Sequence, residues 1–208
     1  MMKIFGTASS KAFRALWMAE EAGIQYEHIV VHPSESHQHA GLLKVNPSGK
    51  IPALLDEGFA LTESLALTTY IARAYAPDFL PSTLQGEALL LQWTLFAATE
   101  IEPPLIAYLH AKGIPFGEVD EEEARLQLDK LHRSFAYLNQ SFSSPYLLGD
   151  KFTVADLNVA SILVWAKIGH VDLLNYPTLN TWLSNCFERA TYIQLQARFK
   201  EQRQNRKS

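Results

Sequence analysis

The nine residues Asn46–Leu54, which read Asn-Pro-Ser-Gly-Lys-Ile-Pro-Ala-Leu, say more about this chain than any other stretch. Pro52 stands directly before the apolar residues of an expected strand. Because its nitrogen carries no hydrogen, Pro52 should cap or interrupt that strand rather than lie inside it. If the Ile51–Pro52 bond is cis, the turn leaves the backbone N–H and carbonyl of Ile51 facing outward. The stretch therefore predicts an edge at which an extended peptide can bind.

A second pair of residues extends this prediction. Glu63-Ser64 precedes the apolar run Leu65–Ala72, which we expect to form a helix. The N–H groups of a first helical turn and the helix dipole bind an anion, and the hydroxyl of Ser64 adds a donor. A backbone edge beside a carboxylate-binding helix start fits the tripeptide glutathione. The pattern Asn-Pro-x-Gly-Lys-Ile-Pro-Ala-Leu followed by Glu-Ser closely resembles that of the glutathione transferase superfamily. The alternative is a proline turn before an ordinary helix.

The flanking sequence predicts one domain over residues 1–77. Apolar spacing gives a strand, a helix that ends at Gly23, a second strand, a hairpin around Asp56-Glu57-Gly58 and a closing helix. A strand–helix–strand unit implies that the first two strands are parallel. The expected bounds are Lys3–Gly6, Tyr26–Val31, Ala53–Leu55, Phe59–Leu61 and Glu63–Tyr75, with a polar loop at His32–Ala40. This order resembles a thioredoxin-like domain.

Residues 84–208 are predicted to be helical, beyond a linker at Ala76–Ser82 that contains two prolines. Glu87–Lys112 should form one long helix that kinks at Pro103-Pro104. Asp120–Asn139 begins with acidic residues, which suit a helix N-terminus. The fold class is thus α/β followed by all-α, which is the cytosolic glutathione transferase architecture that the resemblance implies.

A capping motif adds to the resemblance in this second domain. Thr153 and Asp156 stand at the N-cap and N3 positions of an expected helix, where their side chains can bond each other's backbone. With the preceding Leu148-Gly149-Asp150, they resemble the buried capping motif in the helical domain of glutathione transferases. We expect its role to be folding rather than chemistry.

Composition disfavours several classes of function. The chain has 208 residues, with 48% hydrophobic and 19% charged side chains, as in ordinary globular proteins. A net charge of −4 disfavours a nucleic-acid binder. Apolar runs such as Val159–Ala166 are too short to span a membrane. The single cysteine, Cys186, excludes an intramolecular disulfide and a multi-cysteine metal site. With no signal-peptide pattern, we expect a cytoplasmic protein that has no metal centre and acts on neither nucleic acid nor membranes.

The turn Gly6–Arg14 joins the first strand to the first helix, and in a thioredoxin-like fold it faces the cis-proline, where the ligand's thiol would lie. Lowering a thiol pKa from about 8.5 by two units requires about 2.7 kcal/mol of preference for the anion. A hydroxyl donor at a helix N-terminus supplies energy on that scale. The resemblance assigns this role to Ser10, six residues after Ile4 and four before Arg14, and Ser9 is the alternative. Neither Tyr nor Cys stands in this turn, which disfavours the tyrosine-type and cysteine-type classes. We expect Arg14 to brace its helix.

The resemblance also implies the glutathione contacts, and glutathione is then a co-substrate with no further cofactor. Ile51 would pair its backbone with the cysteinyl part of glutathione. At the γ-glutamyl end, Glu63 would accept from the α-amino group and Ser64 would donate to the carboxylate. The remaining positions lie toward the glycyl or cysteinyl side, and the full set is His37, Lys50, Ile51, Pro52, Glu63 and Ser64.

The function that the resemblance implies is transfer of the glutathione thiolate to electrophilic carbon in small apolar compounds, by a homodimer. The second substrate would lie between the domains, against the long helices. The same thiolate serves peroxide reduction, isothiocyanate conjugation, dehalogenation or double-bond isomerisation, which differ in the variable second-substrate pocket. A non-catalytic carrier that keeps the fold is the alternative from a different class.

Overall fold

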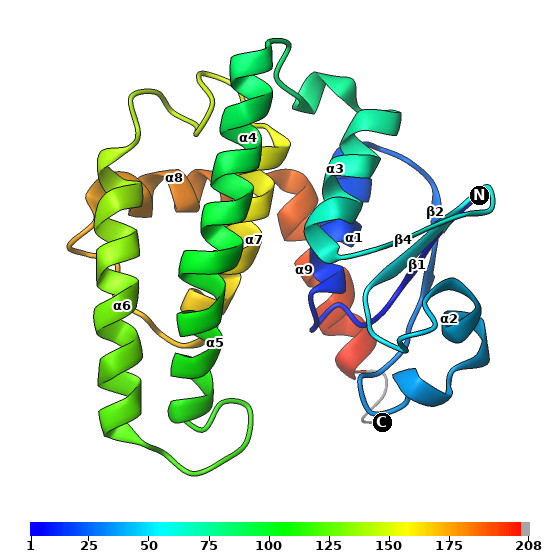
Figure 1. Ribbon diagram of the computed structural model, residues 1–208, viewed down its shortest axis with the longest axis horizontal. Helices are drawn as coiled ribbons and strands as arrows, with labels where there is room; N and C mark the ends of the chain where they lie inside the picture. Colours follow the sequence, from blue (N-terminus) through cyan, green and yellow to red (C-terminus); the bar gives the residue numbers. More distant parts are fainter. Residues whose placement is uncertain (205–208) are drawn as a thin grey trace. The chain divides into compact units, whose positions relative to one another are not determined.

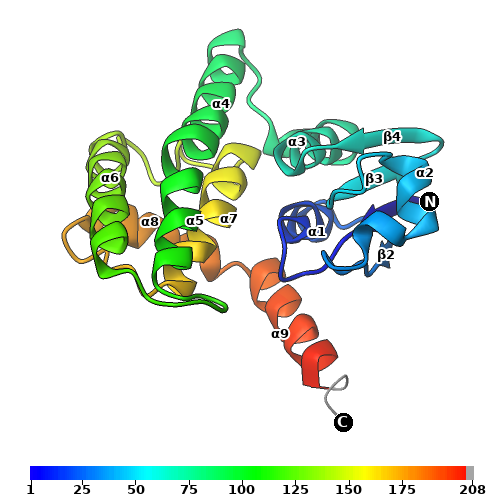
Figure 2. The ribbon, with the colours of Figure 1, turned by 60° about the horizontal axis from the view of Figure 1, so that its bottom comes forward.

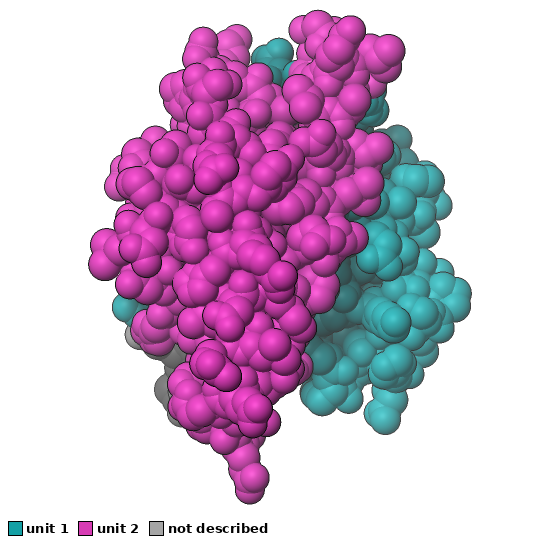
Figure 3. Space-filling view, turned by 60° about the vertical axis from the view of Figure 1, so that its left-hand side comes forward, with its two compact units in different colours: residues 1–80, 189–208 teal, residues 81–188 magenta. Residues whose placement is uncertain are grey.

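The computed structural model describes residues 1–204, with side chains as far as Lys200, and divides into two compact units. One unit comprises Met1–Leu80 together with the chain from Arg189 onward, and the other comprises Pro81–Glu188 (Figure 3). We expected residues 84–208 to form one helical domain, whereas the C-terminal helix packs within the first unit.

The first unit is built on a four-stranded sheet of order β2-β1-β3-β4. β1 pairs with β2 in parallel, as predicted, and the other two pairings are antiparallel. Along the chain the elements are β1 (Met2–Phe5), α1 (Ala12–Glu21), β2 (Tyr26–Ile29), the 3-10 turn η1 (Ser36–Gln38), α2 (Ala40–Val45), β3 (Ala53–Asp56), β4 (Phe59–Thr62), α3 (Ser64–Tyr75), the 3-10 turn η2 (Pro77–Phe79) and α9 (Ala190–Gln204).

Successive side chains of β1 point to opposite faces of the sheet and divide the interior of this unit. Phe5 lies in a buried cluster with residues of α2 and β3, among them Leu42 and Ala53. Its neighbour Ile4 is fully buried on the other face, which α1 and α3 cover (Figures 1 and 2). The ends of β1 and β3 are thus held between two layers, and the candidate site is built on these ends.

The region before β3 departs from the prediction. The expected loop His32–Ala40 contains η1, and α2 begins at its last residue. His39 caps α2, because its Nδ1 accepts a hydrogen bond from the N–H of Leu42 at 3.0 Å. A helix as short as α2 has too few apolar positions to show a helical period.

Helix α9 covers α1 through aromatic and ionic contacts. The ring of Tyr192 lies 5.0 Å from that of Trp17 and 5.8 Å from that of Phe13, both on α1. Just before α9, Arg189 donates to the carboxylate of Glu21 from Nε and Nη2, each at 2.6 Å. The bidentate geometry fixes the start of α9 against the end of α1.

The second unit is helical. Its elements are α4 (Leu84–Phe96), the π-helical segment η3 (Ala97–Ile101), α5 (Glu102–Ala111), α6 (Glu121–Gln140), α7 (Val154–Ile168) and α8 (Pro177–Phe187). Cys186, on α8, is buried. Among the described residues, no helix is long and apolar enough to cross a membrane.

The predicted kink at Pro103-Pro104 takes the form of the π-helical segment before it, and the two prolines fall in the first turn of α5. Because proline has no N–H, Pro104 cannot supply the usual α-helical donor to the carbonyl of Glu100. The hydroxyl of Ser134 on α6 donates to that carbonyl at 3.1 Å instead. The irregular turn is thereby fastened to α6.

Asp156 is the polar centre of the second unit. It is fully buried and accepts hydrogen bonds at 2.9 Å from the N–H and hydroxyl of Thr153, the N–H of Leu147 and the indole N–H of Trp182. Burial raises the pKa of Asp156, and the four hydrogen bonds oppose that shift because each favours the carboxylate. The capping box predicted from the sequence is therefore also a junction between α7 and α8.

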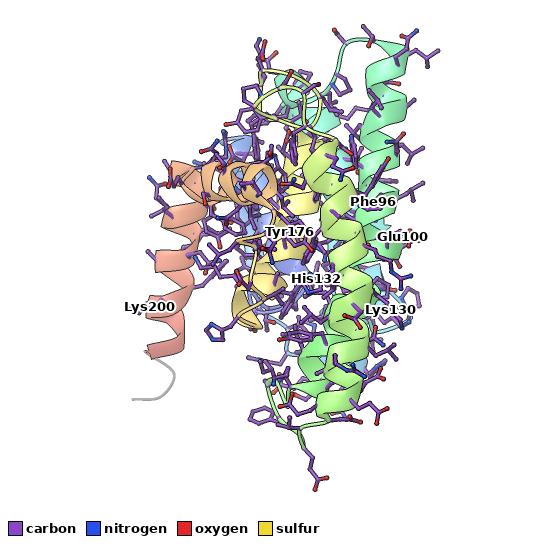
Figure 4. All side chains as sticks on the ribbon, turned by 90° about the vertical axis from the view of Figure 1, so that its left-hand side faces the viewer. Phe96, Glu100, Lys130, His132, Tyr176 and Lys200 are labelled. Carbon is purple, nitrogen blue, oxygen red and sulfur yellow. The ribbon has the colours of Figure 1, made fainter. Side chains whose placement is uncertain are left out.

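The start of α8 is tied to α6 at two points. The Nδ1 of His132 lies 2.8 Å from the hydroxyl oxygen of Tyr176, and Figure 4 shows both side chains between the helices. The amide oxygen of Asn139 accepts from the N–H of Leu179 at 3.0 Å, which satisfies a donor that the first turn of α8 leaves open. Both contacts lie within the second unit and hold its helices together.

Candidate functional site

The turn between β1 and α1 holds the two candidate serines differently. The Ser10 hydroxyl donates to the carbonyl of Thr7 at 2.7 Å and accepts from the N–H of Ala12 at 3.2 Å, in the first turn of α1. Ser9 is exposed, and its hydroxyl donates to that of Thr7 at 3.3 Å. Ser10 is thus the serine whose oxygen is fixed at the helix start.

Gly6 brings Ser10 and Ile51 to the same place. It has a φ of +132°, a conformation that favours glycine. A Cβ built on Gly6 would lie 2.7 Å from the Cβ of Ala12, 3.4 Å from the Cβ of Ile51 and 3.6 Å from the Oγ of Ser10. Only a residue without a side chain therefore lets the serine turn approach the residue before the proline this closely.

The Asn46–Leu54 stretch forms a self-bonded turn. The Asn46 side chain donates to the carbonyl of Lys50 at 2.7 Å and accepts from the N–H and hydroxyl of Ser48 at 3.2 and 2.8 Å. The Ile51–Pro52 bond is cis, which was the condition for an outward-facing backbone at Ile51. No hydrogen bond between described residues involves the backbone N–H or carbonyl of Ile51. These two groups can therefore pair with a ligand's backbone.

His37 lies beside this turn. A Cβ built on Gly49 would lie 2.5 Å from the Nδ1 of His37, so the imidazole lies against the glycine that precedes Lys50. Both His37 and Lys50 are exposed. The structure therefore brings two of the predicted polar residues to one side of Ile51.

Glu63 and Ser64, the other two predicted polar contacts, lie at the start of α3. Ser64 is buried, and its Oγ accepts a hydrogen bond from the Nη1 of Arg14 at 2.9 Å. Since the arginine occupies an acceptor position, the hydroxyl hydrogen of Ser64 is available to donate elsewhere. Glu63 is exposed and has a φ of +68°, which is uncommon outside glycine and clusters at functional sites.

Arg14 is the residue whose role the sequence analysis missed. Its side chain is buried, lies one helical turn after Ser10 and reaches from α1 to the start of α3. We expected it to brace its own helix, but its bond to Ser64 joins two parts of the site. The four-residue spacing from Ser10 was visible in the sequence, whereas the contact with Ser64 was not.

The geometry can hold an extended peptide with an anionic end. It offers a free backbone pair at Ile51 and a helix start with a hydroxyl backed by a buried guanidinium. Among the described residues, no group of three or more His, Cys, Asp or Glu side chains is arranged to hold a metal ion.

Known proteins that resemble this chain in sequence and fold include glutathione transferases. The family "Glutathione S-transferase, N-terminal domain" matches residues 1–73, and "Glutathione S-transferase, C-terminal domain" matches residues 89–190. Glutathione S-transferase hmp2 of Hypomyces subiculosus is 31% identical over 215 residues, covering 95% of this chain and 98% of the relative. Elongation factor 1-gamma 2 of Oryza sativa subsp. japonica is 35% identical over 157 residues, covering 73% of this chain but 37% of that protein. The solved structure of glutathione S-transferase-I bound with lactoylglutathione has a TM-score of 0.83 at 28% identity, covering 94% of this chain and 98% of that one.

Proposed function

The chain belongs to the glutathione S-transferase family and is a glutathione transferase, and from this premise we propose that Ser10 activates the glutathione thiol. The observation that supports the proposal is that Ser10 and Ile51 both lie beside Gly6, in the space that a side chain there would occupy. A peptide paired with the backbone of Ile51 has its cysteinyl side chain near that glycine, and hence near the hydroxyl of Ser10.

Activation then consists of an exchange of hydrogen-bond acceptors. The Ser10 hydroxyl leaves the carbonyl of Thr7 and donates to the thiolate, while its oxygen still accepts from Ala12. A hydrogen bond to a charged group contributes about 1.5–3 kcal/mol and a neutral one about 0.5–1.5 kcal/mol, so the exchange favours the thiolate by about 1 kcal/mol. The start of α1 adds about 0.3–1 kcal/mol through its dipole. These contributions lower the thiol pKa by one to one and a half units, because one unit corresponds to about 1.4 kcal/mol.

The other end of glutathione is held by charge. The γ-glutamyl carboxylate accepts from the hydroxyl of Ser64 and the first N–H groups of α3, and the guanidinium of Arg14 lies behind that hydroxyl. The exposed carboxylate of Glu63 pairs with the α-amino group. His37 and Lys50 complete the site at the glycyl end, where two exposed donors suit a carboxylate.

The activated thiolate attacks electrophilic carbon in a small apolar compound, which we expect to occur in the cytoplasm. Peroxide reduction, isothiocyanate conjugation, dehalogenation and isomerisation use the same thiolate and remain in the proposal as competing reactions. They are distinguished by the second-substrate pocket, so only turnover separates them.

We also propose that the enzyme is a homodimer. Leu84, Leu91 and Leu95 on α4 are 78%, 55% and 53% exposed. Their spacing places them along one face of the helix, and a row of exposed leucines is typical of a surface that another chain covers. The partner we propose is a second copy of this chain.

A non-catalytic role is the second candidate, and the similarity to elongation factor 1-gamma 2 favours it. A chain of that kind would keep the fold without needing an activating hydroxyl. The Ser10 position at the helix start favours the enzyme instead.

The test compares glutathione with S-methylglutathione, which has the same backbone but no thiol. Both should raise the melting temperature at millimolar concentration, since a ligand of the native state stabilises it by mass action. Only glutathione should give a thiolate absorbance in the complex and turnover with an aryl halide, an isothiocyanate, an organic peroxide or a haloalkane. Stabilisation without any turnover would favour the non-catalytic candidate, and no stabilisation by either ligand would contradict the site.

A further inference from the structure

Both backbone polar groups of Gly6, the N–H and the carbonyl, form hydrogen bonds with strand β2. Its N–H donates to the carbonyl of Ile29 at 3.0 Å, and its carbonyl lies 2.8 Å from the Nε2 of His28. Because a carbonyl can only accept, the Nε2 of His28 carries the hydrogen and donates. Gly6 is the residue against which Ser10 and Ile51 both lie. The His28 bond therefore holds the first residue of the turn that orients the candidate catalytic hydroxyl, next to Thr7, whose carbonyl accepts from Ser10.

His28 is itself supported by α9. Its ring packs edge-on against that of Phe199, with 6.0 Å between the ring centroids. Phe199 is buried and also contacts Phe13 of α1 at 6.4 Å. The C-terminal helix thus reaches the strand that holds Gly6, although the two segments are at opposite ends of the sequence.

The neighbouring residues fix this contact from the same side of β2. Tyr26 lies two residues before His28, so their side chains share a face of the strand. Its hydroxyl donates to Glu20 at 2.6 Å, and Arg198 of α9 bridges both, donating to the Tyr26 oxygen at 2.6 Å and pairing with Glu20 at 2.8 Å. The end of α9 is therefore anchored on α1 and β2 beside His28.

We propose that His28 is a positioning residue for the thiol-activating turn, and that α9 holds its imidazole in place. The inference rests on the proposed role of Ser10. We do not expect His28 to touch glutathione. It fixes the carbonyl of Gly6, and through that backbone it sets the direction in which Ser10 presents its hydroxyl to sulfur.

The experiment uses two substitutions of His28 in the full-length protein. His28→Leu keeps apolar bulk against Phe199 and removes the donor. His28→Gln keeps a donor, because the terminal amide nitrogen of glutamine reaches the position that Nε2 occupies. The measurements are the glutathione Kd by calorimetry, the pKa of the bound thiol from thiolate absorbance, and kcat with the best substrate of the panel.

For His28→Leu we expect the pKa of the bound thiol to rise and kcat to fall roughly ten-fold, because small misplacements of a catalytic donor cost rate steeply. The Kd should stay within about two-fold of the wild type, since the binding groups at Ile51 and Ser64 are untouched. His28→Gln should recover most of kcat and the lower thiol pKa. A purely structural role predicts instead a loss of folded protein with the thiol pKa unchanged in the folded fraction.

A second pair of variants tests the contribution of α9. This test can be carried out even if His28→Leu does not fold. Phe199→Ala should raise the thiol pKa in the same direction, whereas Ile193→Ala, on an exposed position of α9, should leave it unchanged. The positioning role is wrong if His28→Leu has the thiol pKa and kcat of the wild type. It is also wrong if His28→Gln and His28→Leu show the same rise in thiol pKa and the same fall in kcat. In either case the proposed function stands. A wild-type protein with no bound thiolate would instead overturn the proposed function itself.

Discussion

The Nη1 of Arg14 donates to the Oγ of Ser64 over 2.9 Å, and both side chains are buried. The two residues are fifty positions apart in the sequence, yet the bond joins α1, which begins at the serine turn, to the start of α3, where we propose that an anion binds. We therefore expect a change at either residue to affect both the serine turn and the start of α3.

Removing the charge of Arg14 should weaken glutathione binding. In Arg14→Met the Ser64 hydroxyl loses its charged partner, and we expect a loss of about 1.5–3 kcal/mol in binding, or roughly ten- to hundred-fold in Kd. Ser64→Ala should lose a similar amount. The double variant should lose much less than the sum of the two, because the residues act together. Lys44→Met, which removes an exposed charge on α2, is the control for net charge, and additive losses in the double variant would contradict the coupling.

Ser10→Ala should separate turnover from binding. We expect glutathione affinity to stay nearly intact and kcat to fall roughly hundred-fold, as when one preorganised donor is lost. The absorbance of the bound thiolate should titrate at higher pH. Ser9→Ala should do much less, because that hydroxyl is exposed and its bond to Thr7 is long. If Ser9→Ala alone lost turnover, the two serines would have exchanged roles; if neither did, backbone N–H groups would carry the activation.

Stability at alkaline pH should depend on Tyr75. Its hydroxyl donates to the buried carboxylate of Asp56, which raises the pKa of Tyr75 to about 12. In the unfolded chain the pKa of tyrosine is about 10. The raised folded-state pKa means that this contribution to stability is complete below the unfolded value and is lost as pH rises from about 10 to about 12. Urea unfolding between about pH 9 and pH 11 should show a steeper fall for the wild type than for Tyr75→Phe. Equal slopes would rule out a contribution from this bond.

Asp156→Ala should be among the most damaging changes in the second unit. It leaves the N–H groups of Leu147 and Thr153 and the indole N–H of Trp182 buried without their acceptor. Losing the acceptor of several buried donors costs about 3–5 kcal/mol. Asp129→Ala, an exposed carboxylate on α6, should change the free energy of unfolding by less than about 0.5 kcal/mol. Denaturant titration of both variants checks the difference.

Dimerisation should depend on the exposed leucines of α4. Leu91→Glu with Leu95→Glu places two charges on the proposed interface, and we expect a monomer by light scattering where the wild type is a dimer. Leu174→Glu changes a leucine that is 78% exposed, more than Leu91 or Leu95, but lies between α7 and α8, and it should leave the dimer intact. A wild-type monomer at all working concentrations would contradict the proposal.

Features made of nearby residues could be predicted from the sequence. The turn at Asn46 is an example, because the Asn46 side chain bonds Ser48 and Lys50, which lie two and four residues further along the chain. The capping box of Thr153 and Asp156 is another. In both cases the residue types and their spacing already define the hydrogen bonds. The local conformation can therefore be predicted from the sequence alone.

Features that depend on distant partners could not be predicted. The apolar spacing of Tyr192 and Phe199 indicates a helix with one buried face but does not say what covers that face. The bond of Arg14 to Ser64 and that of His28 to the Gly6 carbonyl likewise join segments that only tertiary folding brings together. At Pro103-Pro104 the sequence predicted an irregularity, and the hydroxyl of Ser134 that completes it comes from another helix.

The return of α9 to the first unit has a consequence for synthesis on the ribosome. The strands and helices of residues 1–80 are translated before Tyr192 and Phe199, which cover Trp17 and Phe13. A nascent chain therefore carries this aromatic surface exposed to water while the whole of the second unit is being made. The first unit cannot complete its packing before α9 has been made, and we expect a chain that stalls before residue 190 to bind chaperones that recognise exposed apolar surface.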